Sequence, residues 1–224
     1  MYPRVKKINS FSSYEAILNF YTENYAIEIN KERCIGCGLC IKACPNDAMS
    51  SPMLNNKIKV KTADLIPEIP IPSKCSYCGT CAYICPLSAI TMKKDGKIIQ
   101  INDLGIVTKE VVPKLESKSI SCNKIQNKVK VYFDGKIEID WDKCISCMSC
   151  VEVCPSSAFI RIKKQQKDKS QSRKVSFDQN KCIKCGTCIR ACSTNTIRLI
   201  NKKFNFSGNY KKIFWESLLS RIKN

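Results

Sequence analysis

Sixteen of the seventeen cysteines in this chain of 224 residues fall into four copies of one spacing, C-x-x-C-x-x-C-x-x-x-C. The two-residue gaps let three thiolates line one tight loop, and the fourth cysteine follows about one helical turn later. Thiolates at such spacings hold the irons of iron-sulfur clusters. The four motifs are Cys34, Cys37, Cys40 and Cys44; Cys75, Cys78, Cys81 and Cys85; Cys144, Cys147, Cys150 and Cys154; and Cys182, Cys185, Cys188 and Cys192.

Other chemistry of cysteine fits this pattern less well. Structural zinc sites use two separated cysteine pairs or include histidine, and the chain has no histidine. A thioredoxin-like C-x-x-C would be one isolated pair beside a βαβ pattern, which the sequence lacks. A disulfide framework would not need four copies of one spacing. The repeated motif therefore favours iron-sulfur clusters.

The motif is similar to that of bacterial-type two-cluster ferredoxins, in which a proline follows the last cysteine. Pro45, Pro86 and Pro155 follow the first three motifs, whereas Ser193 follows the fourth. Over residues 25–101 and 129–204 the chain resembles a polyferredoxin, a tandem array of such modules. Polyferredoxins are electron-carrying subunits of hydrogenase, formylmethanofuran dehydrogenase and related complexes of methanogenic archaea.

The resemblance implies four [4Fe-4S] clusters whose ligands cross over within each pair of motifs, because the fourth cysteine of one motif ligates the other cluster. The pairing of motif one with two, and of three with four, is favoured by their shorter separation in sequence and by repeated hairpin patterns. The expected sets are Cys34, Cys37, Cys40 and Cys85; Cys75, Cys78, Cys81 and Cys44; Cys144, Cys147, Cys150 and Cys192; and Cys182, Cys185, Cys188 and Cys154.

The expected fold class is α+β, with two tandem ferredoxin modules of small antiparallel sheets and short cluster-bearing helices, and an amphipathic helix at each end. The expected organisation is an N-terminal helical extension (1–24), a first module (25–101, with repeats at about 25–54 and 66–95), a linker (102–128), a second module (129–204, with repeats at about 135–164 and 173–202) and a C-terminal amphipathic helix (205–224).

Local signals predict several elements within this plan. Ser12 and Glu15 form a capping-box pattern before a helix near 13–22. Asp-Gly pairs are typical of tight hairpin turns, and they predict hairpins at 89–101 and 129–140. Apolar residues spaced along one face predict a helix at 210–224. Cys122 lies outside the motifs and is expected to be a free thiol.

The composition and net charge indicate the cellular environment in which the chain works. The formal charge is +19, and four oxidised clusters of about −2 each would lower it to roughly +11. So many unpaired cysteines point to a reducing and anaerobic cytoplasm. The first residues do not resemble a signal peptide, and no apolar run is long enough to span a bilayer. Peripheral association with a membrane complex remains open.

Electron transfer between redox proteins, such as hydrogenase or other oxidoreductase subunits, is the function that the motifs favour. Complete ligand sets leave no iron open for substrate, so no enzymatic activity is expected. One alternative is an iron-sulfur redox sensor that binds nucleic acid through its basic surface, but no recognition motif supports nucleic acid as a partner. Another is a reductase with its substrate at an exposed cluster.

The residue after the first cysteine suggests an order of reduction potentials. An aliphatic Ile35, Ile145 or Ile183 there would shield its cluster from water, whereas Ser76 would not. Water and hydrogen bonds stabilise the more negative reduced cluster. The cluster of Cys75, Cys78 and Cys81 is therefore expected to be the most oxidising.

Overall fold

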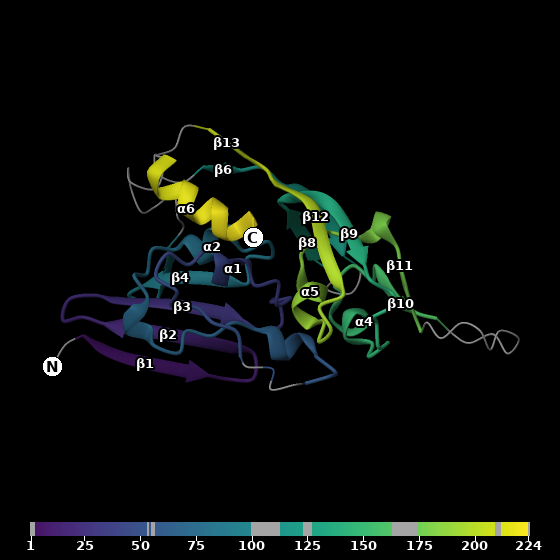
Figure 1. Cartoon of the computed structure of the whole chain (residues 1–224). Coiled ribbons are helices and arrows are strands. Elements are labelled where there is room, and N and C mark those ends of the chain that lie inside the picture. Colours follow the sequence, from purple (N-terminus) through teal and green to yellow (C-terminus); the bar gives the residue numbers. More distant parts are fainter. Residues whose placement is uncertain are drawn as a thin grey trace, which may run out of the picture.

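The computed structural model describes residues 3–52, 54, 57–99, 113–122, 127–162, 174–208 and 212–223. In this part of the chain, small antiparallel sheets combine with short helices, as expected for an α+β protein. One five-stranded sheet belongs to the N-terminal half, and four two-stranded sheets lie mainly in the C-terminal half (Figure 1).

The five-stranded sheet joins the first motif to the second. Its strands lie in the order β1 (Arg4–Asn9), β2 (Ser13–Asn19), β3 (Asn24–Asn30), β4 (Ile90–Lys94) and β5 (Lys97–Ile99). β3 leads into the first motif, and β4 follows the second. Because Ile29 pairs with Ile90 in the antiparallel register, both motifs meet at the same end of the sheet.

The prediction of a helix near 13–22 is wrong, because this segment forms β2. Tyr14, Ala16 and Leu18 are buried, and the residues between them are half-buried. This burial has the period of two that a strand requires. The segment pairs on one side with β1 and on the other with β3, so its neighbours in the sheet override the capping-box signal.

One of the two predicted hairpins is confirmed. β4 and β5 pair from Lys94 and Lys97 outward. Asp95 and Gly96 lie between them with φ of 49° and 77°, the left-handed values that a two-residue hairpin turn needs.

The second predicted hairpin, at 129–140, is wrong. β8 (Asn127–Val131) pairs with β7 (Lys118–Cys122), and β9 (Phe133–Ile139) runs straight through Asp134 and Gly135 to pair with β12 (Ile197–Phe204). Gly135 has φ of 144°, and a Cβ there would lie 2.8 Å from the carbonyl oxygen of Ile200. The glycine therefore permits a close approach of β12, not a turn.

The segment predicted to be a linker (102–128) contains unexpected strands. β6 (Lys114–Leu115) pairs with β13 (Phe206–Ser207), and β7 forms the hairpin with β8. Residues 102–112 and 123–126 of this segment lie outside the described residues. The remaining sheet pairs β10 (Phe159–Arg161) with β11 (Val175–Phe177).

Each motif ends in a short helix. The four helices are α1 (Leu39–Lys42), α2 (Thr80–Ile84), α4 (Ser149–Val153) and α5 (Thr187–Ala191). Each contains the third cysteine of its motif and ends shortly before the fourth. Single turns of 3₁₀ helix, η1 (Thr62–Leu65), η2 (Pro72–Lys74) and η4 (Gln179–Lys181), lie in the connecting segments.

The last helix, α6 (Lys212–Lys223), lies over α1 and α2 of the N-terminal half (Figure 1). Trp215, Leu218 and Ile222 are almost fully buried, in one cluster with residues of α1, α2, β9 and β12. Arg221 donates a hydrogen bond to the carbonyl of Cys44 at 2.8 Å. The helix therefore covers apolar surface of this same chain.

None of the helices among the described residues is long and apolar enough to cross a membrane.

Candidate iron-sulfur sites

The four cysteine loops share one backbone shape. The third and fifth residues of every motif have positive φ, between 49° and 79°. Glycine tolerates this region, but most other residues do so only at a cost in energy. The positive-φ positions are Gly36 and Gly38, Tyr77 and Gly79, Ser146 and Met148, and Lys184 and Gly186. The loops therefore fold alike although their sequences differ.

Each of three cavities is lined by three cysteines from one motif and the last cysteine of another. Apolar side chains, among them Leu87, Phe159 and Ile183, form much of the remaining walls, together with a few serine and threonine side chains. The lining cysteines are Cys34, Cys37, Cys40 and Cys85 in one cavity; Cys144, Cys147, Cys150 and Cys192 in another; and Cys182, Cys185, Cys188 and Cys154 in the third.

The remaining four motif cysteines are also close together. Burial raises the pKa of the Cys75 thiol to about 11, and the neighbouring Cys78 and Cys44 act in the same direction. Burial likewise raises the pKa of Cys81 well above its ordinary value, with Cys78, Cys75 and Cys44 adding to the effect. Cys44, from the first motif, therefore lies beside the three cysteines of the second.

Burial raises the pKa of thiols in the other sites as well, to about 11 for Cys34 and Cys185 and to about 12 for Cys150. These thiols are protonated at neutral pH when no metal is bound. Iron binds the thiolate, so loading must release protons. The apolar surroundings thus disfavour free thiolate charge and favour thiolates neutralised by iron.

The donor set fits a cubane cluster. A [4Fe-4S] cluster takes one thiolate on each of four irons, so its ligands surround a cavity. A zinc ion would instead draw four thiolates to about 2.3 Å from one centre. Within the described ranges, no three histidine, cysteine or acidic side chains are grouped so that they could hold one metal ion.

Two of the sites are neighbours across the two halves of the chain. Cys37 and Cys185 line a further cavity together. After burial and Cys85, the Cys185 thiol also contributes to raising the pKa of Cys37. The first motif therefore faces the fourth.

The sulfur of Cys192 receives more hydrogen bonds than its counterparts. In every motif, the sulfur of the last cysteine accepts a hydrogen bond from the backbone N–H of the residue four positions later. The N···S distance is 3.2 Å for Cys44, Cys85 and Cys154 and 3.4 Å for Cys192. At Cys192 the hydroxyls of Thr196 and Thr194 also lie at 3.2 Å and 3.5 Å. Comparing the repeats would have revealed Thr196, because the other motifs have alanine there.

The predicted shielding by isoleucine holds for two motifs but not for the third. Ile35 and Ile183 are 4% and 3% exposed, whereas Ile145 is 55% exposed. Ile145 lines the cavity of the third motif but remains largely open to solvent, so it covers that site less than the sequence suggested.

Cys122, outside the motifs, is buried at the end of β7.

Family comparisons agree with this geometry. A 4Fe-4S binding domain matches residues 27–50, and two 4Fe-4S dicluster domains match residues 74–160 and 143–196. Together these matches include all four cysteine motifs. The chain is a polyferredoxin-type protein. The polyferredoxin carries 4Fe-4S domains, whose chemistry is electron transfer.

The fold of the polyferredoxin is similar to that of one solved chain in the formate dehydrogenase, heterodisulfide reductase and formylmethanofuran dehydrogenase complex from Methanospirillum hungatei. The TM-score is 0.77 at 19% sequence identity, and the match covers 100% of this chain and 92% of that chain. No curated protein matches the polyferredoxin in sequence.

Proposed function

We propose that this polyferredoxin binds four [4Fe-4S] clusters and relays single electrons between redox proteins, as a non-catalytic subunit of an oxidoreductase complex. When bound, the clusters supply one-electron redox chemistry. The chain supplies the thiolates, the apolar walls and the fixed spacing between sites.

The proposed ligand sets are the crossed ones. They are Cys34, Cys37, Cys40 and Cys85 (the first site); Cys75, Cys78, Cys81 and Cys44 (the second site); Cys144, Cys147, Cys150 and Cys192 (the third site); and Cys182, Cys185, Cys188 and Cys154 (the fourth site). The observation that carries this proposal is that three cavities are each lined by one such set. The dicluster match at 74–160 spans the second and third motifs, so the pairing rests on the cavities.

The crossed sets divide the sites between two modules, at 25–101 and 129–204. β3 and β4 join the first two motifs in one sheet, and β9 and β12 join the flanks of the last two. Contacts between the modules are extensive: Val129 and Ile183 share a buried cluster with Ile29 of β3. The modules are therefore proposed to act as one rigid unit.

Membership of a complex is proposed from the likeness to a chain of the methanogen assembly named above. That assembly combines two dehydrogenases with a reductase, and an electron carrier is the role that we propose for this chain in a complex of that kind. A reducing cytoplasm is the proposed location, because sixteen thiolate ligands must escape oxidation.

The first test is anaerobic iron and sulfide analysis with EPR of the dithionite-reduced protein. About sixteen irons per chain are expected, with spin-coupled signals of reduced [4Fe-4S] clusters. About eight irons, or zinc in their place, would refute the proposal. Cys85→Ser is expected to impair only the first site, while Cys122→Ser, the matched control, should retain all sixteen irons.

The second test measures electron transfer through the iron-loaded chain from one redox protein to another. The iron-loaded chain should accept electrons from a low-potential ferredoxin or hydrogenase and pass them to a second carrier. It should reduce no small-molecule substrate when these proteins are absent. A substrate-dependent reoxidation of the isolated chain would instead indicate a reductase.

A further inference from the structure

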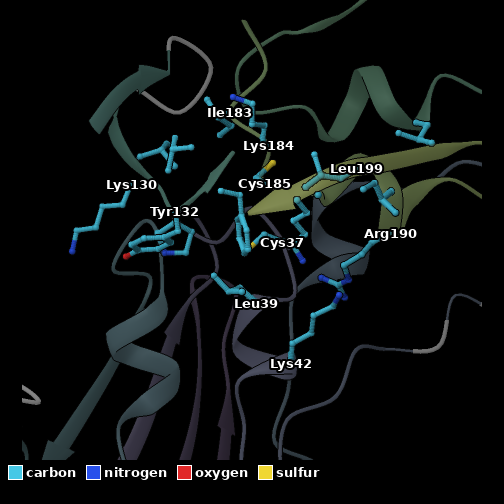
Figure 2. A pocket seen from close by; sticks show the side chains of 18 of the residues that line it. Cys37, Leu39, Lys42, Lys130, Tyr132, Ile183, Lys184, Cys185, Arg190 and Leu199 are labelled. Carbon is cyan, nitrogen blue, oxygen red and sulfur yellow. The ribbon is translucent and has the colours of Figure 1, made fainter. Parts of the chain in front are cut away.

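A cavity of about 320 Å³ lies at the seam between the two modules (Figure 2). Cys37 of the first site and Cys185 of the fourth both line it. Six basic side chains contribute to its wall, and none of the described lining residues is acidic. The basic residues are Lys42, Lys130, Lys184, Arg190, Arg198 and Lys202.

Arg190 crosses this seam. It lies on α5 between two ligands of the second module, Cys188 and Cys192. Its guanidinium donates hydrogen bonds to three acceptors of the first module: the carbonyls of Gly36 and Leu65, the latter at 3.3 Å, and the hydroxyl of Ser51. All three acceptors are uncharged, so these bonds fix the position of the guanidinium and leave its charge unneutralised.

The first cysteine loop is shaped to admit this side chain. Gly38 has φ of 75°, and a Cβ there would lie 2.9 Å from both Cδ and Nε of Arg190. Gly186 occupies the same position in the fourth motif with φ of 79°, but a Cβ there would meet nothing within 4 Å. The glycine of the first loop therefore makes room for Arg190 in addition to allowing the backbone turn.

The charge of Arg190 faces the first site. Its carbonyl acceptor Gly36 lies between the ligands Cys34 and Cys37. Figure 2 shows Arg190 and Lys42 on the same side of the cavity, near Cys37. Lys42, between Cys40 and Cys44, is the counterpart of Arg190 in the first motif. Like charges in one cavity wall repel each other, and nearby negative charge offsets that repulsion; a thiolate-bound cluster carries such charge.

We propose that Arg190 is a positioning residue that reaches from the second module to the first site, where it raises the reduction potential of the bound cluster and fixes that site against the fourth. This inference rests on the proposed function. Reduction adds a negative charge to the cluster, and a fixed positive charge nearby stabilises that reduced state. Because the first and fourth sites lie close together, this seam is where electrons would pass from one module to the other.

The test compares three full-length, iron-loaded variants. Arg190→Gln removes the charge, Arg190→Lys keeps it, and Arg198→Gln removes a charge from an exposed residue of the same cavity wall. The midpoint potential of each cluster is measured by EPR during a redox titration. The signal of the first site is identified by the change that Cys37→Ser causes.

Arg190→Gln is expected to lower the potential of the first cluster by about 59 mV, a tenfold change in its ratio of reduced to oxidised forms. The second cluster, which is not at the seam, should keep its potential. Arg190→Lys should keep the potential of the first cluster close to the wild-type value. Arg198→Gln should change that potential by less than a third of the change that Arg190→Gln causes.

The inference is overturned if Arg190→Gln and Arg198→Gln shift the first cluster equally, or if all four potentials move together in Arg190→Gln. The latter would indicate a general loss of structure. A wild-type chain that fails to hold about sixteen irons would instead refute the proposed function, before any variant is compared.

Discussion

The hydroxyl oxygen of Thr196 lies 3.2 Å from the sulfur of Cys192, four residues earlier in the chain. Thr196 is 4% exposed, so water does not compete for this contact. The other three motifs have Ala48, Ala89 and Ala158 at the same place, and these residues offer only their backbone N–H to the sulfur. Cys192 thus has a side-chain hydroxyl four residues later, where the last cysteines of the other motifs have alanine.

Thr196→Val is expected to lower the reduction potential of the third cluster, the one that Cys192 would ligate. Hydrogen bonds to the ligand sulfur stabilise the more negative reduced state. The decrease should be smaller than about 59 mV, which corresponds to a tenfold change in the equilibrium. Redox titration followed by EPR measures it. Thr196→Ser keeps the hydroxyl and should retain the wild-type value; an equal decrease in both variants would contradict the role of the hydroxyl.

Gly36→Ala is expected to destabilise the iron-loaded protein. A Cβ at Gly36 would lie 2.5 Å from Cβ of Leu65 and 3.2 Å from its carbonyl oxygen, so backbone would have to move. Overpacking of this kind costs about 1–3 kcal/mol, which lowers Tm by about 2–4 °C per kcal/mol in a chain of this size. Thermal unfolding followed by circular dichroism is the measurement.

Gly186→Ala is the matched control for this change. Gly186 has a similar positive φ, but its surroundings are open, so it isolates the cost of the backbone conformation. Equal losses of Tm in the two variants would show that contact with Leu65 contributes nothing.

Ser149→Ala is expected to loosen the contact between the modules. The Ser149 hydroxyl, on α4, accepts a hydrogen bond from the N–H of Val60 at 3.0 Å and donates one to the carbonyl of Ile58 at 3.0 Å. Ser149 and Val60 are almost fully buried, and an unsatisfied buried polar group costs about 1–3 kcal/mol. Hydrogen exchange should increase at Val60. Ser220→Ala, on the exposed face of α6, serves as the control; a Tm as low as that of Ser149→Ala would argue against the proposed contact.

Structure retained by the metal-free, reduced chain is expected to be lost as pH rises from about 8.5 to 11. Burial raises the pKa of Cys34 and Cys185 to about 11 in the folded chain, whereas a thiol of an unfolded chain titrates near about 8.5. Over this interval the folded state binds more protons than the unfolded state, so its stability falls with pH. The full stabilisation is present only at a pH below the thiol pKa of the unfolded chain.

Circular dichroism of the chelated and the iron-loaded chain at pH 7 and pH 10 measures this difference. Iron-bound thiolates have already released their protons, so the loaded chain should lose much less structure. Parallel losses in the two samples would mean that titration of the thiols is not the cause.

Cysteine spacing predicted much of the candidate site because the cluster-binding loop is a local structure. The ligands of one loop lie within seven residues, and left-handed residues recur at fixed places, whether glycine or, as at Tyr77 and Met148, another residue. The hairpin at Asp95-Gly96 was also local. Its turn needs only two positive φ values and two strands that follow directly.

The wrong predictions concern segments whose partners lie far away in sequence. Residues 13–19 carry apolar side chains that suit a helix or a strand, and pairing with β1 and β3 decides for a strand. Asp134-Gly135 has the composition of a turn, but β12, more than sixty residues later, pairs across it. Arg190 could not be recognised for the same reason, since its acceptors lie 125–154 residues away.

α6 follows every cysteine of the four motifs in the sequence, yet Arg221 binds the carbonyl of Cys44, 177 residues earlier. Protein synthesis at about 5–20 residues per second separates these two residues by roughly 10–35 seconds. During this interval the first motif has left the ribosome while its cover does not yet exist. Iron delivered to the nascent chain would meet open thiols, and the late arrival of α6 would then seal the loaded site.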